Sequence, residues 1–306
     1  MEFEIYMRLI SKILFSKLKK SIKPISDTEK IAIESGDTWF ESSIFEGKLN
    51  WNMFDNCKLA KLSKKEQSFI NTRLRELLLE LDDWDINNNY LSKKAWGIIQ
   101  KYKFLGLLIP TKYGGLGFSQ AAHSQIIRII SAKSMAAAVT IMVPNSLGPG
   151  ELILRYGTAS QKKYLKDLAD GKEIPCFGLT GPRTGSDATS MPDSGVVCYK
   201  NIKGKKTLGL SLTFEKRYIT LAPIATLIGL AIDIKDPDNL LGKNKNIGIS
   251  LCLVSADQPG VKIGKRHKPL NVNFMNGPIY GKDVFIPMDA VIGGKDNLGQ
   301  GWKMLT

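Results

Sequence analysis

The chain has 306 residues, of which 43% are hydrophobic and 24% are charged, so it is long enough to bury two cores, and its composition argues against general disorder. Lys and Arg outnumber Asp and Glu by 43 to 29, which gives a formal net charge of +14 and favours anionic partners. Nucleic acid is disfavoured among them, because the basic residues are spread along the chain and form no recognised nucleic-acid-binding motif, whereas cofactor phosphates and anionic lipid surfaces fit the same charge.

The first element that the sequence predicts is a basic amphipathic helix within residues 1–25. Its apolar face would carry Phe3, Tyr6, Met7, Ile10, Ile13, Leu14 and Leu18, and Arg8, Lys12, Lys19 and Lys23 would fall elsewhere on the wheel. No apolar run reaches the roughly 20 residues needed to span a bilayer, and no signal-peptide cleavage pattern follows. Residues 1–23 therefore suit peripheral contact with a membrane surface, or equally docking on this or another protein.

Helical patterns then fill most of the first half of the chain. They cover Leu62–Leu81, Lys93–Leu108, Ser119–Met142 and Gly150–Leu168. The first of them opens with Ser63-Lys-Lys-Glu66, which has the spacing of a capping box. We therefore expect an all-α N-terminal domain over residues 26–172.

Beyond Gly171 the pattern changes to short β-rich runs separated by Gly, Pro, Asn and Asp. The predicted strands are Ile174–Thr180, Gly195–Tyr199, Lys205–Phe214, Tyr218–Ala222, Thr226–Ile234, Ile247–Val254 and Lys282–Ile286. Such a series is typical of a barrel or sandwich. We expect an α+β chain in which a β-barrel-like middle domain over residues 173–295 follows the helices.

Cysteines and histidines offer little chemistry. The four cysteines lie far apart and form no C-x-x-C pair, so a reducing cytoplasm is the simplest location. His123 and His267 are too few for a His-rich metal site, and we expect no bound metal.

A glycine-rich turn carries the strongest indication of ligand binding. It reads Phe177-Gly-Leu-Thr-Gly-Pro-Arg-Thr-Gly-Ser-Asp187 and follows a predicted strand. Glycines let a backbone approach a ligand closely, and successive N–H groups in such turns can bind anions. Plain surface turns have the same composition, however, so the residues alone favour a structural interpretation.

Neighbouring segments change that balance, because together they resemble the acyl-CoA dehydrogenase family. Ile109-Pro-Thr-Lys-Tyr-Gly-Gly-Leu-Gly117 is similar to the family's P-x-x-Y-G-G-x-G turn. Tyr156-Gly-Thr-Ala-Ser-Gln161, followed by Leu168-Ala-Asp-Gly171, is similar to its Y-G-T-x-x-Q…L-x-x-G run.

The resemblance continues in the second half. Thr180–Asp187 stands where the family has T-E-P-x-A-G-S-D, with Gly181 in place of Glu, and Lys216-Arg-Tyr-Ile-Thr220 stands where it has K-x-W-I-T, with Tyr218 in place of Trp. Asp283-Val-Phe-Ile-Pro287 and Gly299-Gln-Gly-Trp302 resemble the exit from its β-domain. Further segments resemble the long bacterial members used in fatty-acid β-oxidation: Ser26–Glu34, Pro144–Gly150 and Tyr218–Ala225.

The resemblance implies FAD-dependent α,β-dehydrogenation of fatty acyl-CoA thioesters, the first step of β-oxidation, with electron-transferring flavoprotein as electron acceptor. It also implies a C-terminal four-helix domain that carries the catalytic carboxylate. Residues 296–306 would be only the start of that domain, which we expect to be absent as in a truncated or split chain. We therefore assign no catalytic residue and expect weak FAD binding and little activity from this chain alone.

Carried over by motif, the cofactor-binding residues are Phe177, Leu179, Thr180, Gly185, Ser186, Tyr218, Ile219 and Thr220, and Ser186 would also approach the acyl-CoA substrate. Three interpretations stay open. The chain could be the flavin-binding part of a dehydrogenase completed by a separate C-terminal segment. It could also be a non-catalytic flavin or acyl-CoA-binding module, or a decayed remnant of the enzyme.

Overall fold

The computed structural model describes residues 11–12, 14–19, 25–35, 38–58, 60–82, 84, 90–146, 148–242 and 244–306. The chain divides into two compact units, Met1–Leu49 with Thr306, and Asn50–Leu305. Within these described ranges, every helix is too short or too polar to cross a lipid bilayer.

The first unit contains short helices. Residues 11–12 and 14–19 are helical, and Leu14 and Leu18 of the predicted apolar face are more than half exposed. The remaining positions of that predicted face, and Arg8 and Lys23, lie outside the described residues, so the amphipathic helix stays a prediction. Helices α2 (Asp27–Ser35) and α3 (Phe40–Phe45) follow.

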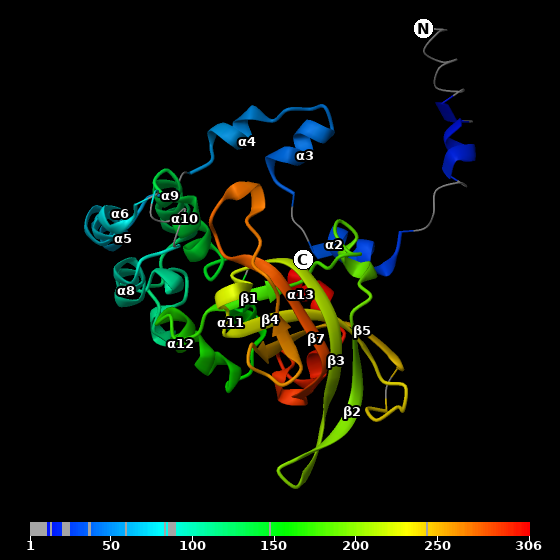
Figure 1. The fold of residues 1–306 in the computed structure, drawn as a ribbon. Coiled ribbons are helices and arrows are strands. Elements are labelled where there is room, and N and C mark those ends of the chain that lie inside the picture. The colour runs from blue at the N-terminus through cyan, green and yellow to red at the C-terminus, as the bar shows by residue number, and fades with distance from the viewer. Residues whose placement is uncertain are drawn as a thin grey trace, which may run out of the picture. The chain divides into compact units, whose positions relative to one another are not determined.

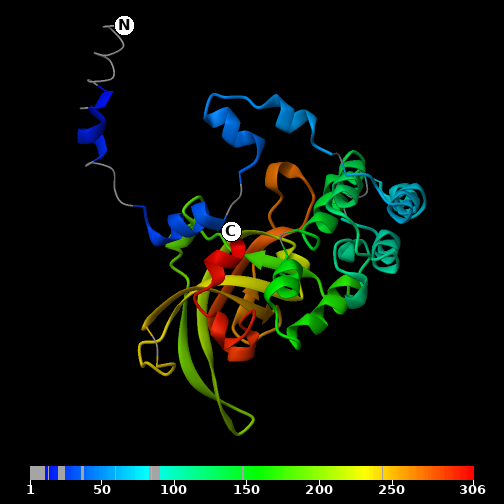
Figure 2. The same ribbon diagram turned by 180° about the vertical axis from the view of Figure 1, so that it is seen from behind.

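The second unit begins with helices, most of which lie to one side of a curled sheet in both ribbon views (Figures 1 and 2). These are α4 (Trp51–Asp55), α5 (Lys64–Phe69), α6 (Arg75–Glu80), α8 (Lys93–Lys101), α9 (Gln120–Ser131), α10 (Met135–Met142), α11 (Pro149–Tyr156) and α12 (Tyr164–Ala169). A π-helical turn, Ile70–Leu74, joins α5 to α6. The predicted order of a helical part before a β part is confirmed.

The predicted capping box forms at the start of α5. Ser63 Oγ accepts a hydrogen bond from the Glu66 N–H, and Glu66 Oε2 accepts one from the Ser63 N–H at 2.7 Å. The same carboxylate also accepts a bond from the Ser119 N–H at 2.6 Å. Glu66 therefore caps two helices, because Ser119 is the N-cap of α9.

Three helix predictions were too long. The helix predicted over Gly150–Leu168 is two helices, α11 and α12, because Gly157 ends α11 with an extended backbone at ψ of 147°. The helix predicted over Lys93–Leu108 ends at Lys101, because Lys103 adopts a left-handed conformation with φ of 57° that an α-helix cannot continue. The helix predicted over Ser119–Met142 is two helices. Ser134 interrupts it with an extended backbone and caps α10 by accepting a bond from the Ala137 N–H.

The sheet has seven strands in the order β1-β4-β2-β3-β7-β6, with β5 paired to the free side of β4. Their bounds are β1 (Pro175–Gly178), β2 (Ser194–Ile202), β3 (Lys205–Thr220), β4 (Leu227–Lys235), β5 (Asn246–Ser255), β6 (Val261–Ile263) and β7 (Asn276–Pro287). Strand β4 runs parallel to β1 and β2, and the other pairs are antiparallel. The sheet curls into a half-barrel, as Figure 1 shows.

The largest error in the predicted strands concerns β3. We predicted two strands, Lys205–Phe214 and Tyr218–Ala222, with a break between them. The strand instead runs continuously to Thr220. The short strand β6 was not predicted, and a short helix, α13 (Gly301–Leu305), ends the described chain.

The helices and the sheet share their apolar cores. Ile153 of α11 and Leu165 of α12 are fully buried in one apolar cluster with Leu227 of β4 and Leu251 of β5. Apolar burial of this kind stabilises a fold by roughly 25 cal/mol per Å². Phe177 of β1 packs against this cluster, so the glycine-rich turn begins from a strand that is anchored on the shared core.

Candidate functional site

The glycine-rich turn leaves β1 and folds back on itself. The Gly181 N–H lies 3.0 Å from the Thr184 carbonyl oxygen and 3.1 Å from Thr184 Oγ1, and Thr184 is buried. Gly185 and Ser186 lie beyond this closure and are exposed. A Cβ atom built on Gly185 would meet nothing within 4 Å, so the turn faces open space there.

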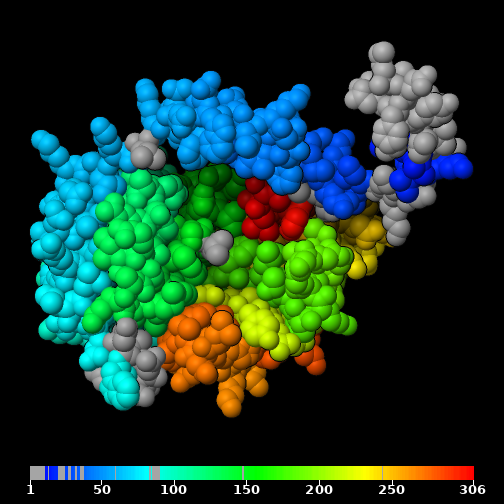
Figure 3. Space-filling view, turned by 90° about the horizontal axis from the view of Figure 1, so that it is seen from above, coloured from blue at the N-terminus to red at the C-terminus, as the bar shows by residue number. Residues whose placement is uncertain are grey.

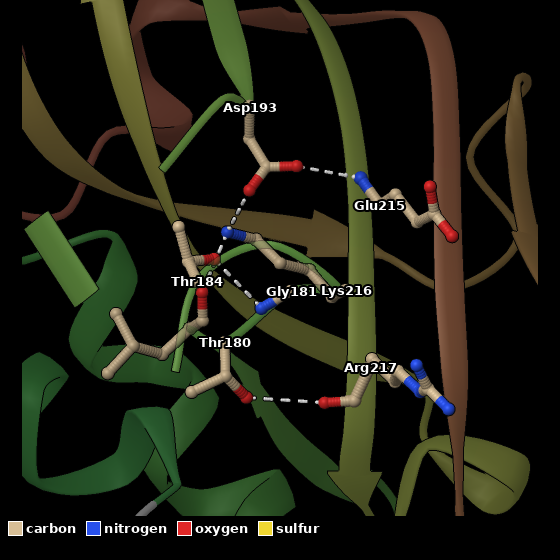
Figure 4. A network of polar contacts seen from close by, with 8 residues as sticks. Thr180, Gly181, Thr184, Asp193, Glu215, Lys216 and Arg217 are labelled. Carbon is tan, nitrogen blue, oxygen red and sulfur yellow. Dashed lines mark hydrogen bonds and ion pairs between the residues drawn. The ribbon is translucent and has the colours of Figure 1, made fainter. Parts of the chain in front are cut away.

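The turn is hydrogen-bonded directly to the last part of β3. Thr180 Oγ1 donates to the Arg217 carbonyl oxygen at 3.2 Å (Figure 4), and the Arg217 N–H donates to the Thr180 carbonyl oxygen at 3.0 Å. The two segments singled out in the sequence, 37 residues apart at this contact, therefore lie side by side.

A buried ion pair, which the sequence did not reveal, supports this junction. Lys216 Nζ lies 2.7 Å from Asp193 Oδ2 and 2.9 Å from the Leu179 carbonyl oxygen, and Asp193 Oδ1 accepts a bond from the Glu215 N–H at 2.7 Å (Figure 4). The side chains of Lys216 and Asp193 are 0% and 3% exposed. Burial lowers the pKa of Lys216, and the Asp193 carboxylate opposes that shift.

One sequence signal could have found the buried lysine. Leu212 and Phe214 point into the core, and side chains two residues apart on a strand share a face. Lys216 is the next residue of that series, so it had to be buried once the strand continued. A charged group on the core side needs a partner, which Asp193 provides.

Tyr218 stands out on the same strand. Its φ of 59° lies in the left-handed region, which is unusual for a bulky residue, and its side chain is 57% exposed. The Arg217 guanidinium carbon lies 4.7 Å from the centre of the Tyr218 ring, and the His267 ring centre lies 5.3 Å from it. Tyr218 therefore has an exposed aromatic ring with two basic side chains close to it.

The other predicted cofactor-binding residues are less exposed. Ile219 is 3% exposed and belongs to the core, so only its backbone can border a ligand. Thr220 is half-buried. Phe177 is also half-buried, and its ring lies so close to Gly229 that a Cβ there would come within 2.7 Å of it. Leu179 is half-buried and packs on the second apolar cluster.

Asp187 ends the turn and serves its structure. Its carboxylate accepts hydrogen bonds from Ser190 Oγ at 2.5 Å and Thr189 Oγ1 at 3.0 Å. These hydrogen bonds, of which the one from Ser190 has the larger effect, lower the pKa of the Asp187 carboxyl group. Such bonds are typical of a residue that closes a turn.

The arrangement can hold a flat ligand with polar groups. An exposed aromatic ring offers a stacking surface, a threonine hydroxyl lies at the neighbouring turn, and the open glycine lets a ligand approach the backbone. Across the described ranges, no group of three or more His, Cys, Asp or Glu side chains is placed to hold a metal ion. These features fit a flavin ring and its phosphates.

A family model matches the helical part of the chain. Residues 61–172 match the family model described as "Acyl-CoA dehydrogenase, N-terminal domain". The chain is 30% identical over 223 residues to subunit CarC of the caffeyl-CoA reductase-Etf complex of Acetobacterium woodii, covering 72% of this chain and 54% of that protein. It is 31% identical over 173 residues to the acyl-CoA dehydrogenase of Bacillus subtilis, covering 56% of this chain and 42% of that protein.

Solved structures show the same fold. The acyl-CoA dehydrogenase of Bacillus anthracis complexed with FAD superimposes with a TM-score of 0.65 at 23% identity, covering 80% of this chain and 39% of that one. The chain spans about half the length of the curated relatives it matches. Residues 61–172 therefore form an acyl-CoA dehydrogenase N-terminal domain, and the chain has the fold of the acyl-CoA dehydrogenases.

Proposed function

We propose that this chain binds FAD and acyl-CoA and takes part in FAD-dependent α,β-dehydrogenation of fatty acyl-CoA thioesters. The observation that carries the proposal is the paired hydrogen bonding of Thr180 with Arg217, which brings the glycine-rich turn beside the exposed ring of Tyr218. The family match of residues 61–172, and the FAD that the Bacillus anthracis relative holds, support the same cofactor.

Bound FAD would supply a two-electron acceptor for the hydrogen leaving the acyl chain. This chain's own residues would bind and orient. Tyr218 would stack on the flavin ring, while the Thr180 hydroxyl would turn from the Arg217 carbonyl oxygen toward the ring's polar edge. Gly185 and Ser186 are exposed on the turn and would meet the cofactor's phosphate side and the acyl-CoA.

Titration of the purified chain with FAD tests the proposal. We expect saturable quenching of flavin fluorescence, weakened by Tyr218→Ala and Ser186→Ala. Tyr199→Ala and Ser190→Ala are matched controls, because Tyr199 is also an exposed strand tyrosine and Ser190 lies four residues after Ser186. If FAD does not bind, or all four variants bind it equally, the proposed site is wrong.

Adding acyl-CoA to the FAD-loaded chain separates the remaining interpretations. Bleaching of the flavin absorbance would show that the chain itself supports dehydrogenation. Binding of both ligands without bleaching would favour a non-catalytic module, or a chain that needs a separate C-terminal segment. A chain that unfolds without a cooperative transition would favour a decayed remnant.

We also propose electron-transferring flavoprotein as the electron acceptor, since one relative is named as a subunit of an Etf complex.

A cytoplasmic location with peripheral membrane contact through residues 1–23 is proposed from the basic amphipathic pattern and the unpaired cysteines. Vesicle sedimentation tests that contact. Equal partitioning onto neutral and anionic vesicles, unaffected by salt, would exclude it.

A further inference from the structure

Asn276, the first residue of β7, is a buried amide that reaches across to β3. Its side chain is 3% exposed, and Nδ2 lies 3.0 Å from the Tyr218 carbonyl oxygen and 3.4 Å from Thr220 Oγ1. Oδ1 has no hydrogen-bond partner in the part of the chain that the structure describes. Both contacts with β3 are therefore made by the Nδ2 hydrogens.

These contacts span an irregularity in the sheet. Lys216 pairs with Ile279, and Ile219 pairs with Gly277. Arg217 and Tyr218 of β3 therefore lie opposite a single residue of β7. This is a β-bulge, a feature that re-aims a side chain. It explains how Tyr218 becomes exposed while its neighbour Ile219 is buried.

Within the bulge, Tyr218 has a left-handed backbone, which is rare for a bulky residue and persists only where the surrounding structure holds it. The Asn276 amide bonds the carbonyl group of this residue. That bond fixes the peptide plane after Tyr218, and with it the direction of the side chain.

Asn276 also places the second group that contacts the ring. Its carbonyl oxygen accepts a bond from the His267 N–H at 2.7 Å, and the His267 ring lies against Tyr218. In the space-filling view the orange loop that contains residue 267 lies beside the yellow-green end of β3 (Figure 3). Asn276 therefore hydrogen-bonds both the backbone of Tyr218 and the backbone of His267, whose ring lies next to the Tyr218 ring.

We propose that Asn276 is a positioning residue that fixes the Tyr218 ring as the stacking wall of the flavin site. This role rests on the proposed function, and it is exerted through Tyr218 rather than by contact with the cofactor.

The direct test is Asn276→Asp, which keeps the shape but replaces both Nδ2 hydrogens with an oxygen that faces the Tyr218 carbonyl. We expect the FAD dissociation constant to rise roughly tenfold, and the bound flavin to fluoresce more strongly at saturation because the ring no longer stacks. Asn273→Asp is the matched control, since Asn273 is equally buried, lies in the loop that leads into β7, and accepts a hydrogen bond from Arg266 through its oxygen.

A double-variant cycle separates positioning from general stability. If Asn276 acts through Tyr218, adding Asn276→Asp to Tyr218→Ala weakens FAD binding no further. Effects of the two substitutions that simply add overturn the proposal, as does unchanged flavin fluorescence in a folded Asn276→Asp protein.

A ring probe makes the inference testable without cofactor. In the full chain labelled with 3-fluorotyrosine, Tyr218→Phe identifies the ¹⁹F signal of Tyr218. That signal should shift in Asn276→Asp and stay in place in Asn273→Asp. If the unmodified chain binds no FAD, the proposed function fails on its own, and an unmoved Tyr218 signal would then overturn the positioning role separately.

Discussion

Lys216 and Asp193 form an ion pair of 2.7 Å that is buried on both sides and lies directly behind the turn carrying Thr180. The ammonium group also holds the Leu179 carbonyl oxygen. Burying a charge is costly unless it is paired and hydrogen-bonded, and here each partner satisfies the other.

Removing one partner should therefore be severe. Asp193→Asn leaves the Lys216 ammonium without a counter-charge, and we expect the free energy of unfolding to fall by about 3–5 kcal/mol in urea denaturation. Adding Lys216→Met to this variant should recover part of the loss, because no buried charge then remains.

The control for this prediction is the exposed pair of Lys235 and Asp233, whose nitrogen and oxygen lie 4.0 Å apart. Asp233→Asn should cost less than about 1 kcal/mol. Equal losses in Asp193→Asn and Asp233→Asn would mean that burial of the first pair does not matter to stability.

Glu66 should make stability depend on pH in the acid range. Burial alone would raise the pKa of Glu66, but the hydrogen bonds from Ser119 and Ser63 outweigh it and lower the pKa to about 2. The folded pKa lies below the unfolded value, so the stabilisation is present above about pH 5 and is lost as pH falls toward 2.

Glu66→Gln should flatten that pH dependence and cost about 1–3 kcal/mol at pH 7, because an amide offers fewer acceptors to the two helix N-termini. Urea midpoints measured from pH 7 to pH 3 check both effects. The control is Glu76→Gln, an exposed glutamate on α6 whose loss should leave the slope as in the unmodified chain. A Glu66→Gln protein with an unchanged acid slope would contradict the assignment.

Only one of the two helix-capping contacts of Glu66 could be predicted from the sequence. The bond with Ser63 was predictable, because it joins residues three apart in a known capping pattern. The bond to Ser119 spans 53 residues, and no local pattern encodes which loop packs against a helix start. Local hydrogen-bonding patterns therefore predict the bond from Ser63 to this carboxylate but not the bond from Ser119.

The candidate site, too, could be predicted from the sequence only in part. Residue types and the family resemblance singled out the turn at Thr180 and the strand at Tyr218, and the structure brings these two segments together. The conformation of Tyr218 depends on a bulge, which is set by the register of β3 against β7 and so by residues some 60 positions away. The break predicted around Lys216 was wrong, because Asp193, the partner that allows this lysine to be buried, lies 23 residues away in the sequence.

Gln161 should hold the helical part to the last loop of the sheet. Its Nε2 donates to the carbonyl oxygens of Asp289 and Val291, both at 2.7 Å, and its Oε1 accepts from the Gly293 N–H at 3.0 Å. Gln161→Glu keeps the shape but sets an oxygen against two carbonyl oxygens, so we expect a loss of about 3 kcal/mol in the free energy of unfolding.

Thermal and urea unfolding of Gln161→Glu check this expectation. Gln67→Glu is the control, since Gln67 is an exposed helical glutamine whose side chain donates to the nearby Asn71 side chain. Its effect should stay within about 0.5 kcal/mol. Should the two variants prove equally stable, the bonds from Gln161 would contribute nothing net.

Thr180→Val separates a cofactor role from a structural role for the turn. Valine keeps the volume but cannot donate, so loss of one hydrogen bond, worth about 0.5–1.5 kcal/mol, should weaken FAD binding by roughly 2- to 13-fold. Thr189→Val is the control, because its hydroxyl group bonds Asp187 in the same turn. Titration with FAD and the melting temperature are measured on both. A lower melting temperature with unchanged FAD affinity in Thr180→Val would show that the hydroxyl only serves its bond to Arg217, and the turn would then be a structural element of the sheet edge.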